Sequence, residues 1–453
     1  MTFDPVNFTV AAPLLALAAG ALVILLLDLI LPAQSIHGWW HVAGLGSAAL
    51  AGYYLIPLWG KDLTGYGGAM LMDQLAVVFG AVLVGAVFLT VLLSTIRTEL
   101  DKSGYLALIL WAAMGMLMMV SAGNLMTVFL GLELLSLALY VAVAFDPEHP
   151  NAREAALKYF VLGSVASAFI LFGFALIYGV TGSMDLSVIA RTPIHGGELY
   201  YKAGMALALV GFAFKLALVP FHAWAPDVYQ GAPTATTAFM AVGTKGAALA
   251  MLARLLMATV PAGSAAAKWL LPLSVLAALS MLWGATVGMW QNDLKRLMAY
   301  SGISHAGYLV MAIPALAADG LTAAAYYMAA YGFTAFGIFA VITLLEAGGE
   351  AGSDLASYEG LYYRRPWLAA SLSLLMFGLA GLPPTGGFIG KFLLAKAAVG
   401  AAATMPANSW TLLVGLIVST GISAYVYLRV IGTMLKKSAR EAAVRHSVAD
   451  TAS

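Results

Sequence analysis

Five charged residues lie inside stretches of sequence that are otherwise apolar and long enough to cross a bilayer. They are Glu133, Lys158, Lys215, Lys245 and Lys391. An ionised side chain at the centre of a bilayer costs at least about 2.5–3.5 kcal/mol on insertion scales, so such residues are normally retained for a function. Because only 9% of the chain is charged, five charges on separate spans predict a polar path through the protein.

Proton transfer is the chemistry that this set of residues suggests. Glu133 and Lys215 both lie far from the ends of their apolar stretches. Removal from water favours the neutral form of an ionisable side chain, and a nearby opposite charge favours the ionised form. A Glu133–Lys215 pair that can separate could therefore hold or release a proton. The alternatives are a structural ion pair for Glu133 and, for Lys215, a side chain that extends to the membrane surface.

The other three lysines differ in their surroundings. Lys245 lies mid-span in the segment GTKGAA, whose glycines leave room for water, and Lys391 follows a run of proline and glycine. Lys158 lies near the start of its span, where a lysine can more easily extend its ammonium group to water. Three further cations are interpreted as anchors at the membrane interface: Arg254, Lys396 and Arg429.

The histidines do not indicate a metal site. His37 and His41 have i,i+4 spacing, but no further ligand is evident near them. His222 and His305 are single polar residues inside apolar segments, and each could be a proton-relay member or a hydrogen-bonded packing residue. The sequence contains no cysteine, and no haem pair, flavin motif, P-loop or GxSxG motif is evident. We therefore expect no bound cofactor or metal and no electron transfer or hydrolysis by this chain.

The composition is that of a membrane protein. The chain has 453 residues and a mean hydropathy of +0.92. Its hydrophobic residues make up 62% of the sequence, a larger share than in soluble domains. Stretches of about 20 apolar residues recur from end to end, so we expect an all-α polytopic membrane protein embedded in the lipid bilayer. The first stretch, residues 8–31, is too long for a signal peptide and is interpreted as a retained span. A net charge of +1 gives no indication of nucleic-acid binding.

About 13 transmembrane helices are expected. Their predicted ranges are 8–31, 38–59, 73–95, 104–121, 124–145, 157–180, 203–220 with a continuation to about 230, 234–259, 269–290, 296–313, 320–346, 367–400 and 409–432. The connections are short, and the longest are residues 181–202 and 347–366. No soluble domain fits between them.

Two of the predicted spans are interrupted next to a lysine. Pro220 and Pro226 follow Lys215, and the segment GLPPTGG precedes Lys391. Broken backbone at membrane depth is tolerated only beside protein or a water-filled cavity. The breaks lie five spans apart, which predicts two inverted five-helix repeats. The alternative is that proline and glycine are simply common in membrane helices.

The predicted division of the chain follows from these repeats. It comprises residues 1–103 with helices 1–3, residues 104–260 as the first repeat with helices 4–8, residues 261–435 as the second, inverted repeat with helices 9–13, and residues 436–453 as a basic tail that the orientation below makes cytoplasmic.

The distribution of Lys and Arg predicts the orientation. With the N-terminus outside, the cytoplasmic loops would carry Arg97, Lys102, Arg153, Lys295, Arg296, Arg364, Arg365, Lys436, Lys437, Arg440 and Arg445. The outer loops would carry only Lys61, Arg191, Lys202 and Lys268. Cytoplasmic loops of membrane proteins are enriched in Lys and Arg, so this excess favours an external N-terminus and a cytoplasmic C-terminus.

Four segments resemble one family of respiratory proteins. They are LGLELLSLALY around Glu133, EAALKYFVLGSVASAFILFG from Glu154, FKLALVPFHAWAPDVYQGAP from Phe214 and KRLMAYSGISHAGYLVMA from Lys295. They are similar to the subunit N family of bacterial NADH–quinone oxidoreductase (respiratory complex I), which belongs to the antiporter-like membrane subunits. The resemblance runs from about residue 8 to 432.

The resemblance implies a role for each buried charge. The family's span-5 glutamate falls on Glu133, its span-7, span-8 and span-12 lysines on Lys215, Lys245 and Lys391, and its span-6 lysine on Lys158. It implies a proton-translocating subunit without a redox centre in the bacterial inner membrane. The expected partners are antiporter-like subunit M and the small membrane subunits, and the complex as a whole uses NADH, FMN, iron–sulfur clusters and quinone. A lysine at position 391 favours subunit N over subunit M, which carries glutamate there.

The end of the sequence departs from the family pattern. Members usually have a fourteenth span, whereas this sequence ends in the basic segment KKSAREAAVRHSVADTAS, which leaves packing at that edge open.

The main alternative function is a subunit of a multisubunit cation/proton antiporter. A further alternative is a passive membrane scaffold whose charges are relics.

Overall fold

The chain folds into a bundle of membrane-length helices. The structure is a computed structural model, and it describes residues 5–30, 38–97, 100, 102–146, 150–194, 196–259, 266–315, 319–350, 352–402 and 406–436. Residues 437–453 of the predicted basic tail, with Lys437, Arg440 and Arg445, lie outside the described residues, as does His37.

The secondary structure is almost entirely helical. In chain order the elements are α1 Pro5–Ile30, α2 Trp39–Leu55, η1 Ile56–Leu58, β1 Leu63–Gly65, η2 Tyr66–Gly68, β2 Met70–Met72, α3 Gln74–Ser94, α4 Ser103–Val120, α5 Leu125–Val143, α6 Pro150–Thr181, α7 Leu186–Ile189, α8 Glu198–Leu216, α9 Trp224–Gly231, α10 Thr234–Phe239, η4 Met240–Thr244, α11 Lys245–Thr259, α12 Ala266–Gly288, α13 Leu294–Val310, α14 Gly320–Ala347, η6 Leu355–Tyr358, α15 Leu361–Arg364, α16 Pro366–Ala380, α17 Gly386–Ala401 and α18 Pro406–Leu435.

The predicted all-α polytopic architecture is confirmed. Within the described residues, 11 helices are long and apolar enough to cross a membrane. The remaining two predicted spans correspond to α13 and to the pair α16 and α17. The sequence did not predict the small antiparallel pair of β1 and β2, nor the short helix α7 in the connection between the sixth and seventh spans.

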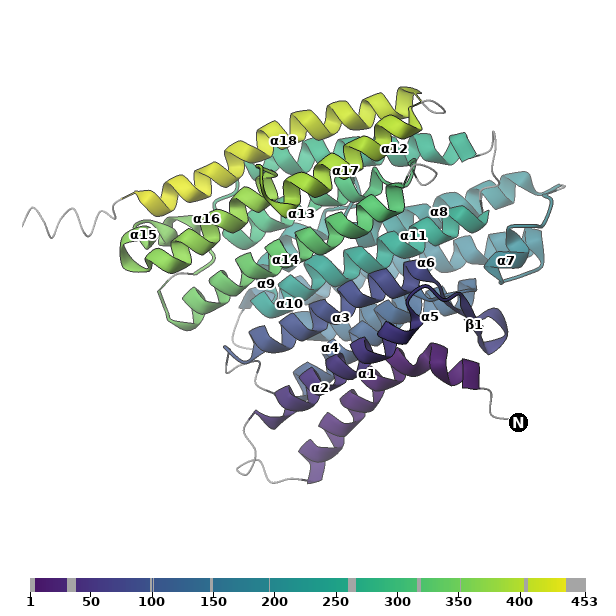
Figure 1. Cartoon of the computed structure of the whole chain (residues 1–453), viewed down its shortest axis with the longest axis horizontal. Helices are drawn as coiled ribbons and strands as arrows, with labels where there is room; N and C mark the ends of the chain where they lie inside the picture. The colour runs from purple at the N-terminus through teal and green to yellow at the C-terminus, as the bar shows by residue number, and fades with distance from the viewer. Residues whose placement is uncertain are drawn as a thin grey trace, which may run out of the picture.

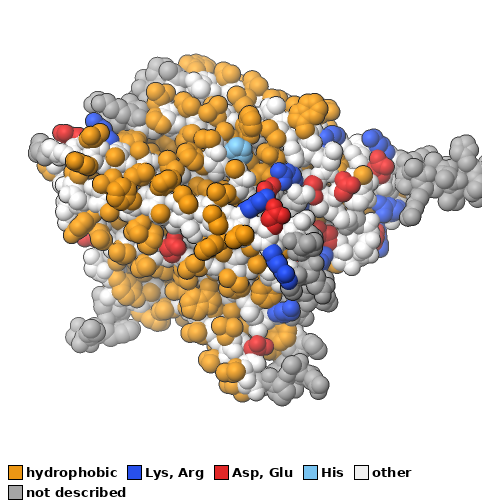
Figure 2. All heavy atoms as spheres, turned by 180° about the vertical axis from the view of Figure 1, so that it is seen from behind, with side chains coloured by type: hydrophobic (Ala, Val, Ile, Leu, Met, Phe, Trp, Pro, Cys, Tyr) orange, Lys and Arg blue, Asp and Glu red, His pale blue; other side chains and the backbone are white. Residues whose placement is uncertain are grey.

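The helices run side by side, so the two ends of the bundle correspond to the two membrane surfaces. Figure 1 shows α7 at the right-hand end and α15 at the left-hand end, with the start of α1 on the right and the end of α18 on the left. Figure 2 shows a surface dominated by apolar side chains, with most of the visible charges gathered toward one end. The start of α1 and the end of α18 thus lie at opposite ends of the bundle, as an odd number of membrane crossings requires.

The same backbone contact occurs twice, once in each half of the chain. Asn124 pairs with Asp185 in an isolated antiparallel bridge, and Asp293 pairs with Asp354 in another. Both bridges join the residue before a helix, α5 or α13, to the connection that follows the next long helix, α6 or α14. Asn124 and Asp293 also cap those helices, accepting from the backbone N–H groups of residues 127 and 296. Because α7 and α15 lie at opposite ends, the two copies are inverted relative to one another.

Both predicted helix breaks are present, and they share a local geometry. The residues that follow α8 and α16, Ala217 and Gly381, both have left-handed backbone conformations, with φ of 57° and 77°. A proline follows within three residues of each, and proline cannot donate a backbone hydrogen bond. The seventh and twelfth spans are therefore each divided into two helices, and a buried lysine lies next to each break: Lys215 at the first and Lys391 at the second.

The most deeply buried span carries Lys245. It is formed by α10, η4 and α11 without interruption from Thr234 to Thr259, and its most apolar window is entirely buried. The segment η4 is a π-helix that ends directly before Lys245. A π-helical turn widens the local backbone and is frequent at functional sites.

An ion pair fixes this central span to its neighbours. Arg254 donates to both carboxylate oxygens of Asp73 at 2.8 Å and to the Val120 carbonyl oxygen at 2.9 Å. Arg254 is only 6% exposed, so its guanidinium group binds within the protein, and its predicted role as an anchor at the membrane interface stays a prediction. Arg429 likewise donates to the backbone carbonyl oxygens of Met289 and Gln291. Both guanidinium groups satisfy buried acceptors that an apolar side chain would leave unpaired.

The Asp73–Arg254 pair should stabilise the fold in a pH-dependent way. Burial raises the pKa of Asp73, but the hydrogen-bonded Arg254 guanidinium more than offsets this and holds the pKa below its usual value. A depressed folded-state pKa adds stability above the unfolded value, about 3.9, and this stability is lost as the pH falls through the folded value.

We expect Asp73→Asn to lower the free energy of unfolding by about 1–3 kcal/mol at neutral pH. Asparagine caps a helix as well as aspartate does, so the change isolates the ion pair. Thermal unfolding of the detergent-solubilised protein provides the measurement, with Glu350→Gln as the control, because Glu350 forms an exposed pair with Arg365. Equal stability of wild type and Asp73→Asn at pH 7 would contradict the assignment.

Candidate functional site

Lys215 is buried at the end of α8, immediately before the first break. It is 2% exposed, and its ammonium group donates to the Ser136 hydroxyl oxygen of α5 at 2.6 Å. The Ser136 hydroxyl donates in turn to the Leu132 carbonyl oxygen at 2.5 Å. The serine is therefore oriented by its own helix to present a lone pair to the lysine.

Aromatic rings surround the same ammonium group. The rings of Tyr140, Tyr159 and Phe214 have their centroids 5.8, 5.7 and 5.9 Å from Lys215 Nζ. Ring faces attract a cation, and the attraction strengthens where water is excluded. This environment tolerates a charged lysine without fixing it to a carboxylate, so the proton on Lys215 is not held by a permanent ion pair.

Glu133 lies on the same face of α5 as Ser136, because residues three apart are neighbours on a helix. One carboxylate oxygen of Glu133 is buried without a hydrogen-bond partner in the described part of the chain. Glu133 is close enough to Lys215 to interact with it electrostatically. Among the described residues, however, no ion pair within 4.0 Å joins the two, and Lys215 binds Ser136 instead. The predicted Glu133–Lys215 pair that exchanges a proton stays a prediction.

Lys158 lies in an ion-pair network rather than alone. Its ammonium group is 2.7 Å from carboxylate oxygens of both Glu154 and Asp227, and its side chain is 42% exposed. Asp227, on α9, also pairs with Arg296 of α13 at 2.6 Å. This geometry fits the alternative of a lysine that reaches water. The network joins the first half of the chain to the second through Asp227, which the sequence analysis missed.

Lys245 lies in a second aromatic enclosure. It is 2% exposed, and the centroids of the Tyr229 and Tyr331 rings are 5.5 and 5.9 Å from its Nζ. A methyl group on Gly302 of α13 would lie 2.4 Å from the same nitrogen. The absence of a side chain at Gly302 therefore gives the ammonium group its place between α11 and α13.

Aromatic rings also connect the two enclosures. Tyr159, beside Lys215, stacks on Trp224 with centroids 4.7 Å apart, and Trp224 meets Tyr229, beside Lys245, at 6.3 Å. The hydroxyl oxygens of Tyr159 and Tyr229 are buried without a partner in the described part of the chain. A buried polar group without a protein partner requires an explanation, and an ordered water is the common one. These hydroxyls give the region between the two lysines a polar character that the sequence did not reveal.

His305 occupies the centre of a hydrogen-bonded group in the second half. Its Nδ1 shares a hydrogen bond of 2.6 Å with the Tyr327 hydroxyl, and its Nε2 shares one of 3.2 Å with the Tyr427 hydroxyl. The Tyr427 hydroxyl also bonds the Ser301 hydroxyl at 2.7 Å. A neutral imidazole donates from one nitrogen and accepts at the other, so this group can reverse its direction by a tautomer change.

Lys391 lies beside the second break and contacts the end of the broken helix. Its ammonium group donates to the carbonyl oxygens of Leu379 and Ala380, both at 3.0 Å. These are carbonyls of the last turn of α16, where the helix dipole favours a cation. Its Nζ also lies 5.0 Å from the centroid of the Tyr308 ring. The break thus supplies the acceptors that the buried ammonium group needs.

The structure brings three predicted residues together in one group. The Tyr331 ring lies 4.7 Å from the His305 ring and 5.9 Å from Lys245 Nζ, and the Tyr308 ring lies 5.4 Å from the His305 ring and 5.0 Å from Lys391 Nζ. Lys245, His305 and Lys391 therefore form a buried row that we call the central row. His222 lies apart from it, half-buried between α8 and α9 with its ring 6.1 Å from that of Trp283. Lys396 is exposed on α17, as expected of a residue at the membrane interface.

The sequence analysis missed the neutral groups around these charges. Ser136 and the tyrosines at positions 140, 159, 229, 308, 327, 331 and 427 all lie in apolar segments, where such residues usually pack. A signal existed only for Asp227, a lone acidic residue just after the first break. In the described residues no group of three His, Asp or Glu side chains could hold a metal ion.

Comparisons with known proteins agree with this arrangement. A family described as "NADH:quinone oxidoreductase/Mrp antiporter, TM" matches residues 122–423. NADH-quinone oxidoreductase subunit N 1 of Symbiobacterium thermophilum is 61% identical over 95% of this chain and 88% of its own length. NADH-quinone oxidoreductase subunit N of Trichlorobacter lovleyi is 38% identical over 97% of this chain and 90% of its own.

Solved structures show the same fold. A chain of respiratory complex I from Thermus thermophilus with bound aureothin has a TM-score of 0.77 and 34% identity, over 93% of this chain and 90% of that one. A chain of the membrane-bound sulfane sulfur reductase, an archaeal respiratory membrane complex, has a TM-score of 0.83 and 25% identity over 96% and 89%.

Fold and site together define an antiporter-like membrane subunit, with broken helices that place lysines in the membrane interior. Within that class, the chain belongs to the family of NADH–quinone oxidoreductase subunit N.

The close approach of Gly302 to the Lys245 ammonium group can be tested by substitution. We expect Gly302→Ala to lower the free energy of unfolding by about 1 kcal/mol, the lower end of the range for overpacking, because the end of the buried Lys245 side chain would have to move away from the new methyl group. Gly246→Ala is the matched control on the helix of Lys245 itself, since its nearest neighbours would be 3.7 Å away, an ordinary contact. Thermal unfolding of the detergent-solubilised protein distinguishes them. Similar effects of both changes would refute the close contact.

Proposed function

We propose that this chain translocates protons across the membrane as subunit N of NADH–quinone oxidoreductase, through half-channels lined by its buried Lys and Glu residues. The observation that carries this proposal is that Lys215, Lys245 and Lys391 are buried in the membrane-spanning part of the chain, where each contacts neutral oxygens or aromatic rings. A buried lysine without a fixed counter-ion can give up its proton, whereas a lysine in a tight ion pair cannot do so readily. Quinone reduction is carried out by other subunits.

In the first half, Glu133 and Lys215 would form the switch. When the Glu133 carboxylate approaches, Lys215 is stabilised as the charged ammonium; when it withdraws, Ser136 and the aromatic rings remain as neutral partners. The proton leaves more readily in the second state because no opposite charge compensates it. Lys158, bound to Asp227, would influence this exchange from the end of α6 nearest the break.

In the second half, the central row would carry the proton onward. Two ammonium groups that flank one imidazole in a low-dielectric interior cannot both stay charged at low cost. We expect at least one of Lys245 and Lys391 to be neutral near pH 7, with His305 passing protons between them. His222 remains a candidate relay member at the first break.

The surroundings of the chain follow from its family. Its partners would be other membrane subunits of the complex, among them antiporter-like subunit M and the small membrane subunits. NADH, FMN, iron–sulfur clusters and quinone would be bound by the complex outside this chain. The membrane would be the bacterial inner membrane, with the end of α1 that begins at residue 5 outside and the end of α18 cytoplasmic. Residues 104–260 and 261–435 would be the two inverted repeats.

A multisubunit cation/proton antiporter is the competing function, because the family description covers both kinds of protein. The relatives that match nearly the full chain are named as oxidoreductase subunits. This observation favours the oxidoreductase.

The Lys215 side chain provides the main test. In the purified complex reconstituted in vesicles, Lys215→Ala should lose most NADH-driven proton translocation while the redox centres of the other subunits still assemble. Lys215→Arg should rescue poorly, because a guanidinium group does not release its proton at accessible pH.

Lys202→Ala is the matched control, since Lys202 is an exposed lysine near the other end of the same helix. It should translocate protons at the wild-type rate, measured by a pH-sensitive dye trapped in the vesicles. Wild-type translocation by Lys215→Ala would rule out a relay role for this residue.

A further inference from the structure

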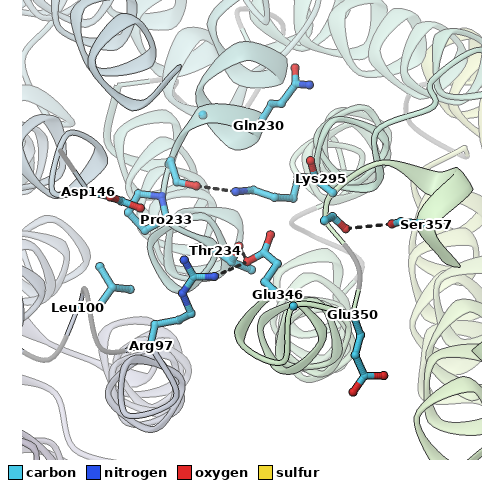
Figure 3. Close-up of a pocket in the computed structure, with 15 residues that line it drawn as sticks. Arg97, Leu100, Asp146, Gln230, Pro233, Thr234, Lys295, Glu346, Glu350 and Ser357 are labelled. Carbon is cyan, nitrogen blue, oxygen red and sulfur yellow. Dashed lines mark hydrogen bonds and ion pairs between the residues drawn. The ribbon is translucent and has the colours of Figure 1, made fainter. Parts of the chain in front are cut away.

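A polar pocket of about 480 Å³ is lined by none of Lys215, Lys245 and Lys391. It forms where α3 and α5 end, α10 and α13 begin, and α14 ends, and its polar lining includes Arg97, Thr234, Lys295 and Glu346. Figure 3 shows these four side chains directed toward one another, whereas Glu350 points away. The pocket lies at the end of the bundle that the Lys and Arg distribution predicts to be cytoplasmic.

Glu346 is the acidic group of this pocket. Its carboxylate accepts a hydrogen bond of 2.8 Å from the Thr234 hydroxyl and lies 3.6 Å from a guanidinium nitrogen of Arg97. The Glu346 side chain is 16% exposed, so water can reach it. The contact with Arg97 is longer than the 2.8 Å contacts of Arg254 with Asp73. The Glu346 carboxylate thus lies near the Arg97 guanidinium group but remains accessible to water.

Lys295 adds a buried charge to the pocket wall. It is 5% exposed, and its ammonium group donates to the Ala232 carbonyl oxygen at 2.6 Å. It lines the pocket together with the charged residues Glu346, Arg97 and Asp146. The Ala232 carbonyl belongs to the short turn between α9 and α10, so Lys295 ties the pocket to the end of α9.

The pocket opens onto the helix that carries Lys245. Thr234 is the first residue of α10, and the buried span continues without interruption to Lys245. A helical rise of about 1.5 Å per residue places that lysine about 16 Å deeper. Tyr229, whose ring contacts Lys245, is joined to α10 through its carbonyl oxygen, which accepts from the Thr237 hydroxyl at 3.1 Å. The pocket therefore lies at the start of this buried span, and Lys245 of the central row lies near the middle of the same span.

We propose that this pocket is the site at which the chain takes up protons from water, and that Glu346 is the residue that receives them. A proton from hydronium binds the Glu346 carboxylate and leaves water behind; it then passes through water to the neutral amine of Lys245, and the carboxylate is restored. The inference rests on the proposed function. It adds a residue from the eleventh span, on the opposite half of the chain from Glu133, to the proton route.

Three variants of the intact complex test the role of the carboxyl group. Glu346→Gln keeps an oxygen for Thr234 but cannot bind a proton, and proton translocation should fall by about 100-fold, the lower range for a positioned proton donor. Glu346→Asp should restore much of it. Glu350→Gln, at the rim of the same pocket, should leave translocation unchanged.

The outcomes separate the inference from the proposed function. If wild type and Glu350→Gln pump and Glu346→Gln pumps equally, the inference fails alone; if wild type does not pump, the proposed function fails. Equal loss in Glu346→Gln and Glu346→Asp would indicate a structural clamp and would also overturn the inference. Should Glu346→Gln not assemble, Thr234→Val removes only the hydroxyl that holds the carboxylate. It should slow translocation severalfold, and no change would count against the proposal.

Cysteine labelling tests the side from which the pocket opens. The chain contains no cysteine, so Ser357→Cys in the pocket lining adds a single label site, and Thr322→Cys adds one in a pocket near Asp319 and Lys396. A membrane-impermeant maleimide should label Ser357→Cys only in inside-out vesicles and Thr322→Cys only in right-side-out vesicles. The reverse pattern would place the pocket on the outer side and overturn proton uptake there.

Discussion

The structure depends on one constraint, which is that hydrocarbon offers no partner to a polar group. Every charge and every backbone donor or acceptor at membrane depth must be satisfied by the protein itself or by water that it encloses. The chain meets this constraint for its lysines with neutral acceptors: the Ser136 hydroxyl for Lys215 and two helix-end carbonyls for Lys391. Neutral acceptors stabilise an ammonium group less than a carboxylate does, and in the proposed function this difference would keep the protons exchangeable.

The helix breaks serve the same constraint, although the two halves use them differently. Lys391 follows its break and contacts the carbonyls that α16 exposes, whereas Lys215 precedes its break and contacts the neighbouring helix α5. The inverted repeat therefore conserves the backbone construction but not the environment of the lysine. Elsewhere the chain pairs charges fully, as in Asp73–Arg254, which joins α11 to the start of α3.

Much of the fold and part of the site could be predicted from the sequence. Apolar runs predicted the spans because a helix that crosses a bilayer needs about 20 apolar residues. The two breaks were predictable because proline and glycine act through local backbone geometry. The environment of Lys158 and the burial of Arg254 were not predictable, since both depend on carboxylates, Asp227 and Asp73, that come from other helices.

The sequence by itself determined the class of protein, the positions of the buried lysines and the resemblance to a respiratory family, because hydropathy and local motifs do not depend on which helices become neighbours. Only the tertiary structure decided what each lysine contacts. It brought Lys245, His305 and Lys391 into one row and placed Gly302 against the Lys245 ammonium group. These contacts join spans far apart in the chain. They are set by how helices pack, and no periodicity within a single span encodes that packing.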